Sequence, residues 1–326
     1  MSFKSILGQE KAVNGLKSLL RSGRIPGALL FHGPAGCGKA MAAIEFAKTL
    51  NCLDASCVKE QDNCSLCTNC KHIQANTHPD IIFAGFAYQA ALESDDPEDI
   101  QSILEKTQSI KVDTVRALTT ASQQKRSVAK WKVFIIDKAE TMERSAANSL
   151  LKFIEEPPQN TVWILLSSNK EKMLKTIKSR CQDVAFEPLK EDVILKILEN
   201  NFIEKSVAQN AVKYAQGSSE NALLAAEILN GIAAYPAGAE FPTAFALNLP
   251  KTLALSRRQV SLTLDMLSFT CYDRWVKQSG EQADRLKNLL TKLVFYKKAV
   301  ARYVSPSMVI EAALISAAAE GITLKD

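Results

Sequence analysis

A glycine-rich segment at residues 33–40 restricts the possible folds of this chain more than any other feature. Its sequence, GPAGCGKA, matches the phosphate-binding pattern G-x-x-x-x-G-K-[S/T] except at the last position. An apolar run at residues 28–31 precedes it, and an alanine-rich helical pattern at residues 39–50 follows it. Glycines let backbone N–H groups converge on phosphate oxygens at a helix N-terminus, and the lysine reaches the outer phosphates. The expected nucleotide-binding residues of this loop are Gly33, Gly36, Gly38, Lys39 and Ala40.

Short apolar runs alternate with helical patterns through the first half of the chain. The predicted strands are residues 28–31, 80–84, 133–136 and 161–167, and the predicted helices are 10–22, 39–50, 112–122 and 145–155. Because the strand cores are continuously apolar, both faces of the sheet must be covered. We therefore expect an α/β fold with a parallel sheet. Residues 85–108 are polar and acidic, and we expect them to form an exposed excursion.

The pattern changes after Pro188. Three short helical stretches, at 190–200, 206–215 and 219–229, are followed by a segment rich in glycine, proline and alanine and then by further helical sequence. We therefore expect an α/β domain over residues 1–187, a small helical domain over 188–230, a linker over 231–243, and an all-α domain over 244–326.

Composition and charge exclude several classes of protein. No apolar run approaches the roughly 18 residues of a membrane span, and residues 1–5 lack the apolar stretch of a signal peptide. The 326 residues include 40 Lys and Arg against 35 Asp and Glu, a net charge of +5. That small excess permits contact with nucleic acid without arguing for it. We expect a soluble, cytoplasmic protein without membrane contact.

The sequence lacks two groups that nucleotide hydrolysis needs. The last loop position normally supplies a hydroxyl to Mg²⁺, but Ala40 has none. Asp137 follows the strand at 133–136 and would hold Mg²⁺, whereas Lys138 stands where a glutamate commonly polarises the attacking water. We expect Glu140 to point elsewhere, and hydrolysis to be slower by several orders of magnitude. The loop is then either a retained scaffold or a site that holds ATP or ADP without cleaving it.

Five of the eight cysteines lie in one short segment: Cys52, Cys57, Cys64, Cys67 and Cys70. Such crowding in a cytosolic chain favours a metal site over disulfides, although reduced cysteines without a metal are the alternative. The spacing C-x-x-C-x-x-C at residues 64–70 lets adjacent sulfurs reach one Zn²⁺ ion at about 2.3 Å. Four thiolates would leave no open coordination position, so the expected zinc is structural.

The sequence does not decide whether Cys52 or Cys57 is the fourth ligand, and His72 is a weaker candidate. We prefer Cys52, because it directly follows the predicted helix at 39–50 and so stands at a rigid position. A nucleic-acid-binding metal module would need basic and aromatic residues here. Residues 54–69 instead contain three acidic residues, one lysine and no aromatic residue, which argues against that function.

Several motifs accompany the phosphate loop and the cysteine segment: ILGQE at 6–10, HPD at 78–80, NSLLKFIEEPP at 148–158 and TIKSRC at 176–181. The last two are highly specific. With these motifs the chain resembles the clamp-loader branch of the AAA+ ATPases over nearly all of residues 1–230, and the remaining length fits the helical collar of that branch. Within the branch it is similar to the bacterial DNA polymerase III subunits of the gamma/tau and delta-prime kinds.

Departures from the family pattern favour the delta-prime kind. Gamma/tau chains are usually longer, and they would carry the hydroxyl and the glutamate that Ala40 and Lys138 replace. A gamma lid helix begins with a sensor arginine, whereas the matching position here is Glu220, whose charge would repel a phosphate. The resemblance therefore implies a degenerate ATPase that keeps the fold of a working one. An active gamma/tau-type ATPase is the alternative.

The resemblance also implies roles for two further residues. In the family, the arginine of the SRC motif, here Arg180, reaches the nucleotide of the neighbouring subunit, where a guanidinium neutralises charge on the transferred phosphoryl group. A surface ion pair is the alternative for Arg180. Asn169 matches the family's sensor-1 region, or it forms a simple turn after a strand. The implied partners are gamma/tau and delta subunits in a hetero-pentamer of the polymerase holoenzyme, the sliding clamp, and primer–template DNA.

Overall fold

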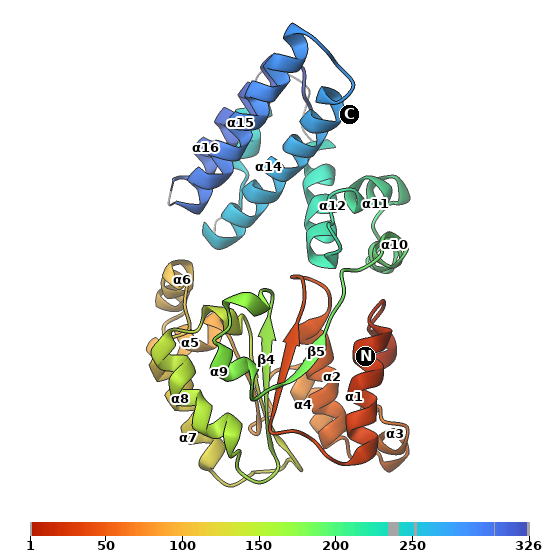
Figure 1. Ribbon diagram of the computed structural model, residues 1–326, viewed down its shortest axis with the longest axis vertical. Coiled ribbons are helices and arrows are strands. Elements are labelled where there is room, and N and C mark those ends of the chain that lie inside the picture. The colour runs from red at the N-terminus through yellow and green to blue at the C-terminus, as the bar shows by residue number, and fades with distance from the viewer. Residues whose placement is uncertain (1, 234–240, 251–252, 303, 325–326) are drawn as a thin grey trace. The chain divides into compact units, whose positions relative to one another are not determined.

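The structure is a computed structural model that describes residues 2–233, 241–250, 253–302 and 304–324. The chain divides into two compact units, Met1–Lys190 and Glu191–Asp326. The first unit contains a parallel sheet with helices on both sides, and the described part of the second unit contains only helices and their connections (Figure 1). The first unit ends at residue 190, whereas the sequence predicted a domain end at residue 187.

One five-stranded sheet forms the centre of the first unit, and all of its neighbouring strands are parallel. The strands are β1 (Ala28–His32), β2 (Ile81–Ala84), β3 (Lys132–Ile136), β4 (Thr161–Ser167) and β5 (Gln182–Ala185), in the spatial order β2-β3-β4-β1-β5. The predicted α/β fold with a parallel sheet is confirmed. β5 was not predicted, because it is an edge strand in which only Val184 is buried and it carries no apolar run.

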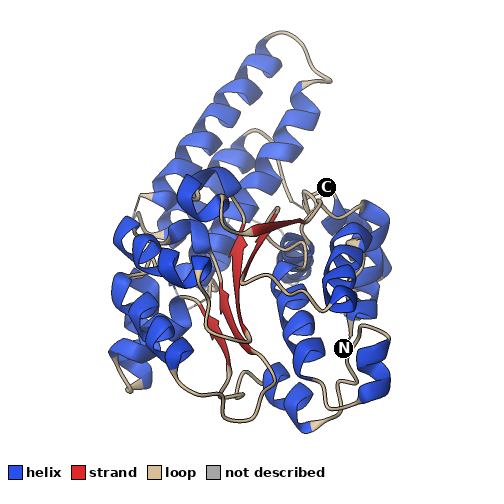
Figure 2. Ribbon diagram, turned by 60° about the horizontal axis from the view of Figure 1, so that its bottom comes forward, coloured by secondary structure: helices blue, strands red, loops and turns tan. Residues whose placement is uncertain are grey.

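Side chains of the central strands alternate between the two faces of the sheet, as the pleat requires. Leu30, Phe134 and Trp163 share one face and pack with α7 (Val112–Gln123) and α8 (Arg144–Glu155). Figure 1 shows these helices on one side of the sheet and α1 (Glu10–Ser22) and α2 (Lys39–Asn51) on the other. Figure 2 shows the strands in red between helices. Because both faces are covered, every residue of β3 and β4 is buried, which explains their continuous apolar runs.

The other helices of the first unit are α1 (Glu10–Ser22), α2 (Lys39–Asn51), α3 (Ala55–Lys59), α4 (Thr68–Gln74), α5 (Phe86–Glu93), α6 (Pro97–Lys106) and α9 (Lys175–Lys178). Short 3₁₀-helices lie at η1 (Phe3–Ser5), η2 (Ala139–Thr141) and η3 (Lys170–Lys172). Helices α1, α2, α7 and α8 were predicted within a residue or two of their observed ends.

Residues 85–108, which we expected to form an exposed excursion, contain two helices that the sequence did not predict, α5 and α6. The carboxylate of Asp96 caps α6 by accepting a hydrogen bond from the backbone N–H of Glu98 at 2.8 Å, and Pro97 stands in the first turn. Negative charge is favourable at a helix N-terminus. The acidic residues that suggested an exposed excursion therefore stabilise the start of a helix, although no residue of α6 is fully buried.

The second unit is helical throughout its described residues. Its helices are α10 (Glu191–Asn200), α11 (Lys205–Val212), α12 (Ser219–Ala233), α13 (Phe241–Leu247), α14 (Leu253–Trp275), α15 (Glu281–Ala301) and α16 (Pro306–Ala319). Of the predicted linker, residues 231–233 belong to α12 and 241–243 to α13, and 234–240 lie outside the described residues. Among the described helices of the chain, none combines the length and apolar character that crossing a membrane would require.

Candidate nucleotide and metal sites

The phosphate loop lies at the carboxyl ends of the parallel strands. It follows β1 and leads into α2, and its glycines adopt positive φ angles: +150° at Gly33, +68° at Gly36 and +99° at Gly38. Asp137 directly follows β3, and Asn169 lies just beyond β4. Parallel strands end at the same edge of a sheet, which is where ligands bind in folds of this class. The structure thus brings the candidate nucleotide residues to one edge.

Gly33 cannot carry a side chain in this loop. A Cβ atom built there would lie 2.2 Å from the carbonyl oxygen of Phe186, at a φ that side-chain-bearing residues rarely adopt. We expect Gly33→Ala to lower the free energy of unfolding by about 2 kcal/mol or more. The control is Gly15→Ala, at an open position inside α1, where alanine should be neutral or stabilising by up to about 1 kcal/mol. Urea unfolding measures both, and equal midpoints for the two variants would contradict this expectation.

Lys39 folds back onto the loop that precedes it. Its Nζ donates a hydrogen bond to the carbonyl oxygen of Gly33 at 2.7 Å and another to that of Pro34. Nζ also lies 3.8 Å from the Sγ of Cys37, and the lysine is 9% exposed. The loop itself therefore satisfies the ammonium group that would otherwise contact the outer phosphates. A nucleotide would have to replace these contacts in order to engage Lys39.

Gln9 ties the phosphate loop to the segment that follows β5, a role that sequence reasoning missed. Its side-chain Nε2 donates to the carbonyl oxygen of Cys37 at 3.2 Å and to that of Glu187 at 2.7 Å. Its Oε1 accepts from the backbone N–H of Glu187 at 3.0 Å. The side chain is buried, so these bonds form away from water and hold the loop in place. The only signal in the sequence was the ILGQE motif that contains Gln9.

The segment after β3 contains the other charged groups of this edge. Burial raises the pKa of the Asp137 carboxyl, although the backbone and charge of Lys138 and the charge of Lys39 favour its ionised form. The Nζ of Lys138 lies 4.9 Å from the centre of the Phe86 ring in α5. Glu140 accepts hydrogen bonds from the backbone N–H of Ser168, at 3.1 Å, and from its hydroxyl. The Glu140 carboxylate is therefore engaged just beyond β4.

Asn169 caps a short helical turn. Its Oδ1 accepts hydrogen bonds from the backbone N–H groups of Glu171, at 3.1 Å, and Lys172, at 3.3 Å. This geometry matches the turn after a strand, one of the two interpretations of the sequence.

In the second unit, Glu220 forms an ion pair with Arg258 of α14, so the negative charge predicted at the start of α12 is partly balanced.

Arg180 lies between α9 and β5, with its side chain 38% exposed. Its Nε donates to a carboxylate oxygen of Glu155, the last residue of α8. Its Nη1 donates to the carbonyl oxygen of Thr176 at 3.0 Å and to the hydroxyl of Ser179 at 3.3 Å. In the chain alone Arg180 therefore forms a surface ion pair, and its exposure leaves the guanidinium accessible to another molecule.

Four cysteine sulfurs converge beside α2. The Sγ atoms that lie within 4.8 Å of one another are those of Cys52, Cys64, Cys67 and Cys70. Cys57, in α3, is not part of this group among the described residues. The His72 ring is also turned to another partner, because its Nδ1 lies 3.1 Å from the hydroxyl oxygen of Thr77. The structure thus groups Cys52 with the three closely spaced cysteines.

The donor chemistry of the four sulfurs fits Zn²⁺. Backbone N–H groups donate to them: that of Cys67 to the Sγ of Cys64 at 3.2 Å, and that of Cys64 to the Sγ of Cys52 at 3.4 Å. Burial raises the pKa of the Cys52 and Cys70 thiols. For Cys67, burial is outweighed by hydrogen bonds from the backbone of Leu53 and Cys70 and from neighbouring cysteine side chains, which together lower the pKa to about 7. Four thiolates around one Zn²⁺ would stand about 3.8 Å apart. The cluster can therefore hold a metal ion.

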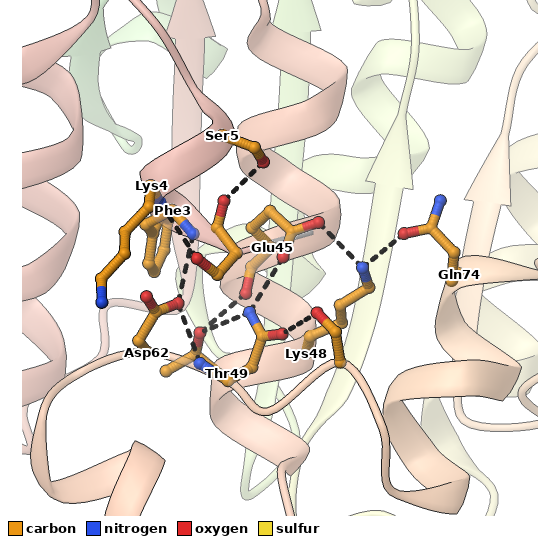
Figure 3. Close-up of polar contacts among 11 residues, drawn as sticks. Phe3, Lys4, Ser5, Glu45, Lys48, Thr49, Asp62 and Gln74 are labelled. Atoms are coloured by element: carbon orange, nitrogen blue, oxygen red, sulfur yellow. Dashed lines mark hydrogen bonds and ion pairs between the residues drawn. The ribbon is translucent and has the colours of Figure 1, made fainter.

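Buried polar contacts join the cysteine segment to α2 (Figure 3). The Nζ of Lys48 lies 2.8 Å from Oε1 of Glu45, and both side chains are 1% exposed. Gln74 of α4 accepts a second bond from Lys48, and Asn63 donates to Oε2 of Glu45 at 2.9 Å. Asp62 accepts from the backbone N–H of Phe3 at 3.1 Å. Since a buried ion pair is stable only when its remaining polar atoms are satisfied, α2 depends on the position of this segment.

The chain is similar to several known proteins. A family model described as DNA polymerase III, delta subunit, matches residues 8–190. The chain is 30% identical over 220 residues to the DNA polymerase III subunit delta' of Bacillus subtilis, covering 68% of this chain and 59% of that protein. It is 31% identical over 228 residues to the tau/gamma subunit of Haemophilus influenzae, covering 68% of this chain and 30% of that protein. Each match spans less than two thirds of the relative's length.

One solved structure is similar over most of the chain. It is the crystal structure of a DNA polymerase III gamma subunit-related protein from Thermotoga maritima, with a TM-score of 0.54 and 16% sequence identity. The similarity covers 94% of this chain and 99% of that one. At so low an identity, this similarity concerns the fold alone.

Proposed function

Since this chain belongs to the DNA polymerase III delta-subunit family, we propose that it is a delta-prime-like subunit of the bacterial clamp loader. In that role it would help to place the sliding clamp on primed DNA, together with gamma/tau and delta subunits in a hetero-pentamer. It would act in the cytoplasm as part of the polymerase holoenzyme. Its own nucleotide site would be degenerate, and Arg180 would complete the site of the subunit beside it.

The residues at the edge of the sheet where the phosphate loop lies carry this proposal. Ala40 offers a methyl group where Mg²⁺ needs a hydroxyl, and Lys138 offers an ammonium group where hydrolysis needs a carboxylate. Lys39 is bonded to the carbonyl oxygens of its own loop. These features support a loop that keeps its shape, held by Gly33 and Gln9, without performing the chemical step. Occupancy by ATP or ADP is compatible with that geometry.

The surface of the second unit supports a role in assembly. Large apolar side chains are exposed on α14, α15 and α16; examples are Phe269, Phe295 and Met308, which are 50%, 68% and 68% exposed. Exposed apolar side chains of this size are available to pack against another protein. We assign residues 244–326 to an oligomerisation collar and 188–230 to a lid. The four-cysteine cluster would then be a structural zinc module within the AAA+ domain.

An active gamma/tau-type ATPase is the second candidate, because the chain is related to both kinds of subunit. Residues Ala40 and Lys138 favour the delta-prime kind. Nucleotide turnover separates the two candidates, since a gamma/tau-type subunit would hydrolyse ATP at its own loop.

Arg180→Ala tests the proposed role in the complex. The variant is reconstituted with the cognate gamma/tau and delta subunits, clamp and primed DNA, and phosphate release is followed before the steady state. Hydrolysis at the one site that Arg180 serves should slow by about 10³-fold, so one phase of phosphate release should disappear. Arg24→Ala, which removes an exposed arginine elsewhere in the same unit, should leave all phases in place. A complete set of phases with Arg180→Ala would limit this residue to a structural role.

A further inference from the structure

Two carboxylates stand at an unfavourable place in α8. Glu155 is the last residue of this helix and Glu156 caps it. The C-terminus of a helix carries partial negative charge, so acidic residues there raise the free energy of the helix. A sequence that breaks a local rule in this way needs a compensating interaction, and such departures concentrate at functional sites.

Only one of these two carboxylates has a compensating partner in the described structure. Glu155 accepts a hydrogen bond from the Nε of Arg180. Glu156 is exposed, and its carboxylate forms no hydrogen bond or ion pair with any described residue. The two glutamates therefore share a helix end and a charge but differ in this single contact.

Two of the three guanidinium nitrogens of Arg180 are bonded to groups of its own chain. Nε is bonded to Glu155, and Nη1 is bonded to Thr176 and Ser179. Nη2, at the tip of the side chain, donates no hydrogen bond to the described part of the chain. Bonds at Nε and Nη1 fix the plane of the guanidinium, and this leaves Nη2 to meet an anion.

Stability alone does not explain this ion pair. Both side chains are well exposed, at 38% and 45%, and exposed ion pairs contribute little to the free energy of unfolding. A long arginine side chain otherwise loses rotamer freedom when it docks on a ligand. Fixing the side chain beforehand removes that cost from the binding step.

We propose that Glu155 is a positioning residue for Arg180. It holds the guanidinium so that Nη2 meets the terminal phosphate of a nucleoside triphosphate bound to the neighbouring subunit. Its effect on that neighbour's reaction is exerted through Arg180 alone. The inference rests on the proposed function, because it needs Arg180 to act across an interface.

Glu155→Gln tests the inference, with Glu156→Gln as the matched control that removes the same charge from the same helix end. In the reconstituted complex, Glu155→Gln should slow the phase that depends on Arg180 by about tenfold with little change in the KM for ATP, because the arginine is misplaced rather than lost. Glu156→Gln should stay within about twofold of the wild type. Both variants should unfold at the same urea concentration.

The double variant Glu155→Gln/Arg180→Ala distinguishes this inference from the proposed function. It should behave like Arg180→Ala alone, because Glu155 has no other route to the reaction. If Arg180→Ala removes the phase while Glu155→Gln behaves like Glu156→Gln or accelerates the phase, only the positioning role of Glu155 is overturned. If Arg180→Ala leaves the phase intact, the proposed function and this inference both fail.

Discussion

Replacing Cys67 by serine is expected to abolish metal binding and to destabilise the first unit by several kcal/mol. The wild-type chain should contain about one zinc ion, and the variant none, because a serine hydroxyl is a poor substitute for a thiolate ligand. Structural zinc supplies folding free energy directly. Without it, the segment that covers the buried Glu45–Lys48 pair would loosen and expose both charges to water. Metal analysis of the purified protein and urea unfolding measure the two effects.

Cys57→Ser is the matched control for this experiment. Cys57 lies in the same segment, and its substitution also replaces one sulfur by oxygen, but its sulfur is outside the group of four. The control should retain both the metal and the stability of the wild type. Absence of zinc from freshly purified, reduced wild-type protein would refute the assignment of a zinc module. Loss of zinc in Cys57→Ser but not in Cys67→Ser would refute the ligand set.

The isolated chain, mixed with Mg²⁺ and ATP, is expected to show essentially no turnover. A working clamp-loader ATPase should exceed it by several orders of magnitude, since both the Mg²⁺-binding hydroxyl and the catalytic carboxylate are missing at Ala40 and Lys138. A steady-state phosphate-release assay measures the rate. Binding of a fluorescent ATP analogue is measured separately, because a loop can hold a nucleotide without cleaving it.

Lys39→Ala provides the control for the turnover experiment. Any trace of hydrolysis in the wild-type preparation should persist in this variant, since it would come from a contaminant rather than from the loop. Robust hydrolysis that Lys39→Ala abolishes would sink the delta-prime assignment and favour the gamma/tau alternative. The turnover rates expected for the two kinds of subunit differ by several orders of magnitude, so the assay separates them clearly.

Much of the first unit could be predicted because its signals are local. Continuous apolar runs predicted four of the five strands, since β1, β3 and β4 are buried on both faces and β2 carries the same type of run. The family resemblance rested on short motifs, and the match over residues 8–190 confirms it. The sequence also placed Asp137 after a strand, and in the structure Gly33, Asp137 and Asn169 all lie just after strands that end at one edge of the sheet.

The remainder depended on contacts that no local pattern reports. β5 is a short edge strand with one buried residue, so its place beside β1 comes from the pairing and not from an apolar run. The acidic residues at the start of α6 indicated solvent exposure but did not show whether the exposed segment is a loop or a helix. Composition does not separate these two interpretations, because the same charges are favourable in both environments.

The order of residues along the chain was sufficient to establish the class of fold, the missing chemical groups and the spacing of the cysteines. These properties follow from side-chain type and short-range geometry. Only the folded chain showed that Lys39 bonds to its own loop, that Gln9 reaches Glu187, and that Arg180 is held by Glu155 rather than Glu156. Each of these contacts is set by a hydrogen bond of a few ångströms between groups whose meeting depends on how the strands and helices pack, and no property of either residue alone encodes it.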